Sequence, residues 1–290
     1  MRIVTYRAQR GPRAGVLLGD GVVDLWDALG GDGSSVRELL AAARLDEAAA
    51  VAASQAIDDA ATVADGEPVP LARVELLPPV PDPQKIICIG LNYRAHAAEA
   101  GIEPPASPTF FAKFANALAA PGATVPLPAA SEKVDFEAEI AFVVGRRCRG
   151  VAETDAAEYV AGYMLFNDLS ARDLQFATPQ WMPGKVFDGS APCGPALVTP
   201  DEALGEGPLS FSLTLNGEEM QAASTEDLIF SVPQLLSHLS RLMTLEPGDI
   251  VATGTPSGVG STRDPRVWLK PGDEIAISSP QLGRLETAIA

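Results

Sequence analysis

The stretch VDFEAEIAFVVG, residues 134–145, carries the pattern that decides the fold of this chain. Charged and apolar residues alternate in its first half and an apolar run follows, which predicts a β-strand. AGYMLFNDLS, residues 161–170, is more apolar still and predicts a second strand. Between the two, VAETDAAEYV predicts a short helix capped near Thr154 or Asp155. The middle of the chain is therefore expected to be mainly sheet.

Further strands are expected on both sides of this centre. Strand patterns occur at residues 86–90, 109–114, 195–200, 209–217, 249–256 and 273–278. Helical patterns occur beside these strands at residues 93–101, which Gly101 and Pro104 stop, and at residues 232–245. Strands outnumber helices and do not alternate with them regularly. We therefore expect an α+β fold rich in antiparallel or mixed sheet, and not a doubly wound parallel sheet.

The first part of the chain has a different character. Residues 1–25 contain short apolar stretches broken by glycine, as in small β-hairpins, and the Ala- and Leu-rich residues 35–61 predict one or two helices. A proline-rich passage at residues 65–85, with a strand at VELL, follows. We place a domain boundary there, with a small α+β N-terminal domain at residues 1–79 and a larger domain at residues 80–290.

The composition limits the classes of function. With 290 residues, 47% of them hydrophobic, the chain can bury a sizeable core. Its net charge of −17 argues against nucleic acid or an anionic membrane as a partner. The three cysteines have no paired spacing, and the sequence has neither a signal-peptide pattern nor an apolar run of about 18 residues. We expect a cytoplasmic protein.

Clustered carboxylates are the first candidate site. In a strand, Asp135, Glu137 and Glu139 point to one face, where they could simply be a solvated face of an edge strand. Asp168, at the end of the very apolar second strand, favours another interpretation because a carboxylate there is costly unless it is paired or bound to metal. Hard oxygen ligands of this kind suit Mg²⁺ or Mn²⁺.

A histidine and a glutamate form the second candidate site. His96 and Glu99 lie three residues apart on one face of the predicted helix in GLNYRAHAAEAG, residues 90–101. A carboxylate beside an imidazole helps it to take a proton, which is the role of a general base. His238, the other histidine, lies in an amphipathic segment and is interpreted as inert.

Basic and glycine-rich segments complete the candidates. An anionic substrate needs counter-charges, for which Lys113, Arg172 and Lys185 are available, although lysines are usually solvated. Arg172 and Gln175 are spaced to lie on the same side of a helical turn. TGTPSGVG, residues 253–260, has backbone N–H groups that could cradle a carboxylate or phosphate, but it is no P-loop.

Taken in order, these segments resemble the fumarylacetoacetate hydrolase (FAH) family from about Lys85 to Leu285. The stretches that carry the resemblance are KIICIGLNYRAHAAEAG, FEAEIAFVVG, NDLSARDLQ, GKVFDGSAPCGPALV, LNGEEMQ and PGDIVATGTPSGVG. The first 79 residues also resemble the small N-terminal domain of many bacterial members. The resemblance implies a mixed β-sandwich roll, usually a homodimer, in the larger domain.

The resemblance also implies roles for individual residues. Glu137, Glu139 and Asp168 would hold one Mg²⁺ or Mn²⁺, whereas Asp135 matches no assigned position. His96 with Glu99 would activate water or move a proton, and Lys185 would stabilise an enolate or oxyanion. Arg172 and Gln175 match positions that contact the substrate, and Thr255 matches a threonine near the substrate carboxylate. Lys113 is a further candidate contact on account of its charge, not of the resemblance. The helix that bears His96 would act as a lid.

Several reactions share such a site. A metal that chelates a pyruvoyl unit stabilises the enolate formed when an adjacent bond breaks. The intact His–Glu pair favours hydrolysis of the C–C bond of an acylpyruvate or related diketo acid. A decarboxylase or a keto–enol isomerase of oxaloacetate or a 2-hydroxydienedioate is the alternative, and a binding protein without turnover is a third. Two interpretations are open for Phe110, Phe176, Trp181 and Met182: they shape the distal pocket, or they are core residues.

Overall fold

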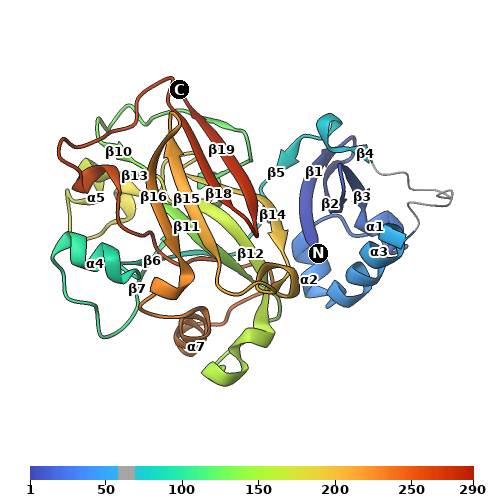
Figure 1. Cartoon of the computed structure of the whole chain (residues 1–290). Coiled ribbons are helices and arrows are strands. Elements are labelled where there is room, and N and C mark those ends of the chain that lie inside the picture. The colour runs from blue at the N-terminus through green and yellow to red at the C-terminus, as the bar shows by residue number, and fades with distance from the viewer. Residues whose placement is uncertain (58–68) are drawn as a thin grey trace.

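The computed structural model describes residues 1–57 and 69–290 (Figure 1). Three strands and three helices build the first part of the chain, residues 1–57, where the predicted hairpins and helices are confirmed. Residues 58–61 of the predicted helical region lie outside the described residues. Ser35 and Glu38 form a capping box that fixes the start of α2. The elements are β1 (Arg2–Ala8), β2 (Gly11–Leu18), β3 (Gly21–Asp24), α1 (Leu25–Ala28), α2 (Val36–Ala41) and α3 (Leu45–Ile57).

The first part does not have a sheet of its own. Its strand β1 pairs with β14 (Ala191–Val198), so β1, β2 and β3 extend a twelve-stranded sheet that runs through the larger body. The short strands β4 (Val69–Pro70) and β5 (Leu76–Leu77) pair with β3 and β1. The boundary at Pro79 remains a prediction.

The centre of the large sheet is mixed, as the sequence predicted. Its order beyond β14 is β12, β11, β17, β6, β7, in which β11 pairs antiparallel with β12 and β17 pairs parallel with β6. The bounds are β12 (Val160–Asn167), β11 (Ala138–Val144), β17 (Ile250–Ala252), β6 (Ile86–Gly90) and β7 (Thr109–Lys113).

Strands β11 and β12 are buried at every residue because each face of the sheet is covered. On β11, Ile140 and Phe142 enter a core shared with the second sheet, whereas Ala141 and Val143 enter a core shared with Leu25 and other residues of the first part. This double coverage explains the apolar run that marked the strand in the sequence.

A five-stranded sheet packs against this body. Its order is β16, β15, β18, β19, β9, and contacts between β14 and β19 join it to the large sheet. Of these strands, the sequence predicted only β15 and β18. Strand β16 was missed, although Asn216 and Gly217 form a hairpin turn between β15 and β16 in which both residues have positive φ. The bounds are β16 (Glu218–Ser224), β15 (Ser210–Leu215), β18 (Glu274–Ser279), β19 (Gly283–Ile289) and β9 (Thr124–Val125).

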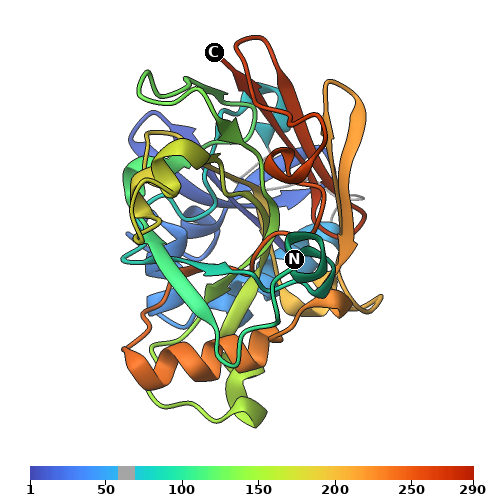
Figure 2. The same ribbon diagram turned by 90° about the vertical axis from the view of Figure 1, so that its left-hand side faces the viewer.

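Helix α7 (Val232–Leu242) lies at one end of the larger body (Figure 1; Figure 2). The capping box of Ser231 and Gln234 begins α7, which lies beside η4 (Glu153–Tyr159). Against prediction, η4 is a 3₁₀-helix that follows Ala152 without a side-chain cap, because neither Thr154 nor Asp155 lies at its start. No helix among the described residues is long and apolar enough to cross a membrane.

The remaining elements are short. They are the strands β8 (Leu118–Ala119), β10 (Val134–Asp135) and β13 (Ser170–Ala171), the helices α4 (Arg94–Ala100), α5 (Arg172–Gln175) and α6 (Pro200–Ala203), and the 3₁₀-helices η2 (Leu71–Arg73), η3 (Ala115–Ala117), η5 (Met182–Gly184), η6 (Thr225–Asp227) and η7 (Gly260–Thr262).

Candidate active site

An interruption between two strands brings three carboxylates together. Strand β10 ends at Asp135 and β11 begins at Ala138, so Glu137 lies in the break, where its carbonyl accepts the N–H of Asp168 at 2.9 Å. The register of β11 and β12 pairs Ala138 with Asn167, which sets Asp168 beside Glu137. Together with Glu139, these residues offer oxygen atoms that all lie within 4.8 Å of one another, and all three residues are buried.

Two buried ammonium groups compensate part of this charge. Lys185 Nζ lies 2.7 Å from Glu137 Oε2 and 2.8 Å from Asp168 Oδ2, and Lys113 Nζ lies 2.6 Å from Asp168 Oδ1. Neither lysine is solvated, because each is only 2% exposed. Although burial alone would raise it, the pKa of Glu137 falls to about 2 because the cations Lys185 and Arg172 face this carboxylate.

Glu139 carries the uncompensated part of the charge. It accepts the backbone N–H of Gly254 at 2.8 Å. Burial, together with the charges of Asp168 and Glu137, raises the pKa of Glu139 well above its usual range. Three buried, adjacent carboxylates of which one lacks sufficient counter-charge fit a hard divalent cation such as Mg²⁺ or Mn²⁺.

Asp135 is not one of the three carboxylates whose oxygen atoms lie within 4.8 Å of one another. The chain leaves the strand conformation at Phe136 and Glu137, so the alternation that would align Asp135 with Glu137 and Glu139 is interrupted. Asp135 instead accepts the N–H groups of Gly260 at 2.7 Å and Ser261 at 3.0 Å. Asp135 also accepts a hydrogen bond from Arg172 Nε at 2.8 Å. Its side chain is fully buried.

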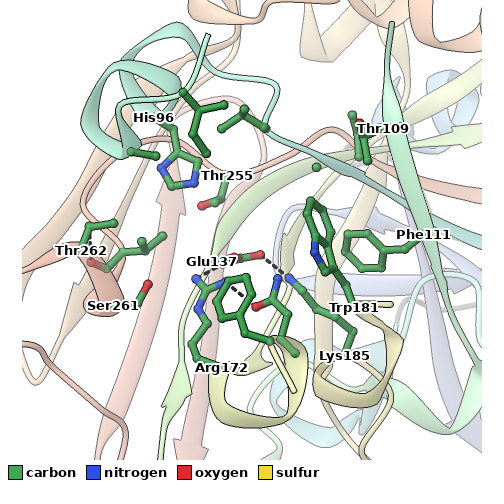
Figure 3. Close-up of a pocket in the computed structure, with 18 of the residues that line it drawn as sticks. His96, Thr109, Phe111, Glu137, Arg172, Trp181, Lys185, Thr255, Ser261 and Thr262 are labelled. Atoms are coloured by element: carbon green, nitrogen blue, oxygen red, sulfur yellow. Dashed lines mark hydrogen bonds and ion pairs between the residues drawn. The ribbon is translucent and has the colours of Figure 1, made fainter. Parts of the chain in front are cut away.

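Arg172 and Gln175 lie on the same side of α5, as predicted. Arg172 Nη1 donates to Gln175 Oε1 at 2.9 Å, and Arg172 Nη2 lies 2.8 Å from Glu137 Oε1. Burial alone would lower the pKa of Arg172, but the negative charges of Glu137 and Asp135 raise it above its usual range. A permanently charged, oriented donor therefore reaches the carboxylate cluster (Figure 3).

His96 and Glu99 form the predicted pair on α4. The atoms His96 Nδ1 and Glu99 Oε2 are 3.1 Å apart, and Glu99 Oε1 accepts the N–H of Gly258 at 3.0 Å. Helix α4 ends at Gly101, which has the left-handed conformation with φ of 64°. Because Glu99 is anchored to the glycine-rich segment, the imidazole that it contacts has a defined orientation. His96 and Thr255 line the same pocket (Figure 3).

The glycine-rich segment binds carboxylates of the protein itself. The N–H groups of Gly254, Gly258 and Gly260 donate to three different acidic residues, Glu139, Glu99 and Asp135. The sequence suggested that these donors could cradle a ligand, but in the structure they position the site. A side chain would not fit at Gly258, where a Cβ atom would lie 2.3 Å from the carbonyl oxygen of Met220.

These groups surround one pocket of about 430 Å³ (Figure 3). Of the predicted site residues, those in its lining are His96, Glu137, Glu139, Arg172, Gln175, Lys185 and Thr255. Lys113, predicted to contact the substrate, is not among them, because its ammonium lies beneath the cluster against Asp168. Asp168 and Glu99 likewise lie behind the lining.

The distal wall agrees in part with the prediction. Phe176 and Trp181 line the pocket, but Phe110 and Met182 do not. Phe111 lines it in place of Phe110, because successive residues of β7 point to opposite faces of the sheet.

Comparison with known proteins agrees with this arrangement. Residues 85–290 match the family model described as Fumarylacetoacetate (FAA) hydrolase C-terminal. The chain belongs to the fumarylacetoacetate hydrolase family. The resemblance seen in the sequence from Lys85 onward is thereby confirmed, and the mixed structure with several sheets is consistent with an FAH-like fold.

Two curated FAH relatives illustrate the range of similarity. The chain is 38% identical over 299 residues to fumarylacetoacetate hydrolase domain-containing protein 2 homolog of Dictyostelium discoideum, which covers 98% of this chain and 96% of the relative. It is 42% identical over 217 residues to oxaloacetate tautomerase FAHD2A, mitochondrial, of Bos taurus, and the match covers 74% of this chain and 69% of the bovine protein. The name of the bovine protein places it in mitochondria, so the cytoplasmic expectation for this chain is not confirmed.

Two solved structures match the whole chain. A putative HpcE protein from Mycobacterium smegmatis has 37% identity and a TM-score of 0.85, covering 100% of this chain and 99% of its own. A maleylpyruvate hydrolase from Sphingobium sp. SYK-6, solved with manganese(II) and pyruvate, has 31% identity and a TM-score of 0.78 with the same coverage. The family thus includes tautomerases and hydrolases.

One connecting residue of this FAH-family site was not singled out in the sequence. Gln221 on β16 is buried, and its Oε1 accepts the N–H of Ala138 at 2.9 Å while its Nε2 donates to Thr255 Oγ1 at 2.9 Å. It therefore ties the start of β11 to the glycine-rich segment. A signal was present, since LNGEEMQ ends on this glutamine, but nothing local indicates its partners.

Proposed function

We propose that this chain catalyses keto–enol tautomerisation of a small 2-oxo acid, with oxaloacetate as the first substrate to test, and that it requires Mg²⁺ or Mn²⁺. The observation that carries the proposal is a single pocket lined by His96, the partner of Glu99, and by the buried carboxylates Glu137 and Glu139. The similarity to oxaloacetate tautomerases supports this reaction over the hydrolysis that the sequence favoured.

Glu137, Glu139 and Asp168 would hold the metal ion. Their oxygen atoms are close enough to share one cation, and the raised pKa of Glu139 reflects negative charge that a cation would relieve. When bound, the ion would supply a Lewis acid that polarises the 2-oxo group. A related hydrolase has been solved with manganese(II) and pyruvate, a 2-oxo acid of the proposed class.

The pocket offers donors for an anionic substrate. Arg172, Gln175 and Thr255 line it and would orient the carboxylate of the substrate. Lys185, whose ammonium bridges Glu137 and Asp168, would stabilise negative charge on the enolate oxygen. Lys113 would act as a positioning residue, since its ammonium holds Asp168 from the side away from the pocket.

His96 would move the proton. If Nδ1–H donates to Glu99, the lone pair on Nε2 is free to take a proton from carbon C3 of the keto acid. The electrons of that C–H bond then form the C2–C3 double bond, and those of the carbonyl move to its oxygen. Return of a proton to the oxygen completes the enol, and the reverse sequence regenerates the keto form.

Hydrolysis of a C–C bond in an acylpyruvate or related diketo acid is the second candidate. The same His96 and Glu99 could direct water at a distal carbonyl. The similarity to a maleylpyruvate hydrolase favours this alternative. It needs a substrate with a second carbonyl, whereas tautomerisation does not.

Turnover by the EDTA-stripped protein, with Mg²⁺ or Mn²⁺ added back, separates these reactions. Oxaloacetate, acetylpyruvate and fumarylpyruvate would be followed by the ultraviolet absorbance of the enol and by NMR. Metal-dependent acceleration of enol decay with oxaloacetate left intact supports the tautomerase. Release of pyruvate plus a second acid would establish the hydrolase instead, and carbon dioxide from oxaloacetate would establish a decarboxylase.

We further propose a homodimer and a cytoplasmic location for this chain. Light scattering after size exclusion would give twice the 30.2 kDa of one chain for the dimer. Fractionation of the cells that make the protein would test the location.

A further inference from the structure

The pocket is larger than a four-carbon acid needs, and its two ends differ. Its buried end contains Glu137 and Glu139, which are 6% and 1% exposed. Its open end includes Ile102 and Phe176, which are 53% and 66% exposed. A volume of about 430 Å³ lies within the range of roughly 300–1,000 Å³ in which pockets hold drug-sized ligands. A substrate bound by its 2-oxo acid end at the buried carboxylates could therefore extend a tail towards the opening.

The wall along which such a tail would lie is apolar. Ile89, Phe111 and Trp181 line it, and the rings of Phe111 and Trp181 meet edge to face with their centroids 5.9 Å apart. Trp181 also packs closely on the chain at Gly90, where a Cβ atom would lie 2.4 Å from its ring. This wall is thus preformed and suits hydrocarbon.

The charges along the pocket are distributed unevenly. The two cations in its lining, Arg172 and Lys185, are held within 2.8 Å of carboxylates at the buried end. His96 is paired with Glu99, so that pair brings no net positive charge. At the open end the lining contains Glu103, which is exposed and follows α4. Among the described lining residues, the mouth therefore presents negative charge without a cation to balance it.

We propose that this site prefers 2-oxo acids whose distal end is uncharged and apolar, and that Glu103 selects against a carboxylate at the end of a long tail. The inference rests on the proposed function only in placing the 2-oxo acid end at the buried carboxylates. Oxaloacetate is compatible with it, because its second carboxylate is attached directly to C3 and does not stand at the end of a long tail. A long diacid would instead bring its second carboxylate to Glu103.

Two acids of equal length test the proposal. The acids 2-oxoheptanoate and 2-oxoheptanedioate differ only in a terminal methyl or carboxylate group, and calorimetry on the Mg²⁺-loaded protein gives their affinities without turnover. We expect the wild type to prefer the monoacid. Glu103→Gln should reduce that preference about fivefold, the effect of two unit charges about 4 Å apart in water, and Glu103→Lys about twenty-fivefold.

The matched control is Glu153→Gln, which removes the same charge from an exposed position on η4 outside the pocket and should leave the preference unchanged. A preference that is the same in wild type, Glu103→Gln and Glu103→Lys would overturn the proposal, as would tighter binding of the diacid by the wild type or no binding of either acid. If oxaloacetate is not tautomerised but the Glu103 variants shift the preference as expected, the proposed reaction fails and the selection at the mouth stands.

Discussion

Arg172 Nη2 lies 2.8 Å from Asp135 Oδ2, and this ion pair is buried beside the three carboxylates that could bind metal. Asp135 also holds the N–H groups of Gly260 and Ser261, so one side chain fixes both the guanidinium and the turn that begins η7. It thereby positions two parts of the pocket lining without itself facing the pocket.

Replacing Asp135 by alanine should destabilise the fold. The change leaves Arg172 with one buried carboxylate partner, Glu137. It also leaves three backbone N–H groups, those of Phe136, Gly260 and Ser261, without their acceptor. Removing one member of a buried ion pair lowers the free energy of unfolding by about 3–5 kcal/mol. Urea denaturation would measure this, with Glu153→Ala as the surface control, for which a change within about 0.5 kcal/mol is expected. Equal unfolding free energies for the Asp135 variant and the wild type would contradict the assigned role.

Replacing Glu139 by glutamine should remove metal-dependent turnover and preserve the fold. The amide oxygen can still accept the N–H of Gly254, but the negative charge that would attract the cation is lost. Mn²⁺ binding followed by electron paramagnetic resonance should weaken, while the thermal unfolding midpoint stays at or above that of the metal-free wild type. Undiminished metal-dependent turnover would rule out Glu139 as a ligand.

Replacing His96 by asparagine should separate metal binding from proton transfer. His96 is not one of the three candidate metal ligands, Glu137, Glu139 and Asp168, so the affinity for Mn²⁺ should be unchanged. Loss of a general base typically lowers the rate by about 10²–10⁴-fold, mainly in kcat. His238→Asn on α7 is the matched control, because this second histidine lies outside the pocket. Full activity of His96→Asn would exclude the pair from the reaction.

The pairing of Asp24 predicts a pH dependence of stability in the first part of the chain. Burial acts to raise the pKa of Asp24, but hydrogen bonds from Arg13 and Tyr6 lower it below the usual value of 3.8. A carboxyl group whose pKa is lowered by folding stabilises the protein above the unfolded value, and this contribution is lost as the pH falls through the folded value. Asp24→Asn should therefore lower the unfolding free energy at pH 7 by about 2 kcal/mol, the scale of a hydrogen bond to a charged group. Unfolding in urea at pH 7 and pH 3 would measure a difference from wild type that shrinks at the lower pH; a constant difference would contradict this assignment.

Local patterns were sufficient for the elements that build the centre of the fold. Strands β11 and β12 were predictable because both faces are buried, which makes their sequences apolar, and α4 was predictable because Gly101 ends it. The hairpin strand β16 and the interruption after Asp135 were not predicted. Strand β16 has little apolar alternation, and the interruption depends on the N–H groups of η7, which are more than a hundred residues away.

The sequence by itself determined the residue types of the site and the segments on which they lie: Glu137 just before one strand and Glu139 in it, Asp168 after the next strand, and His96 with Glu99 on one helical turn. Only the tertiary structure decided which of these side chains meet. Gly258 donates to Glu99 from 159 residues away, and Lys185 lies between Glu137 and Asp168 because three separate segments pack together. Such partners are set by the packing of elements distant in the chain, and a local pattern carries no information about them.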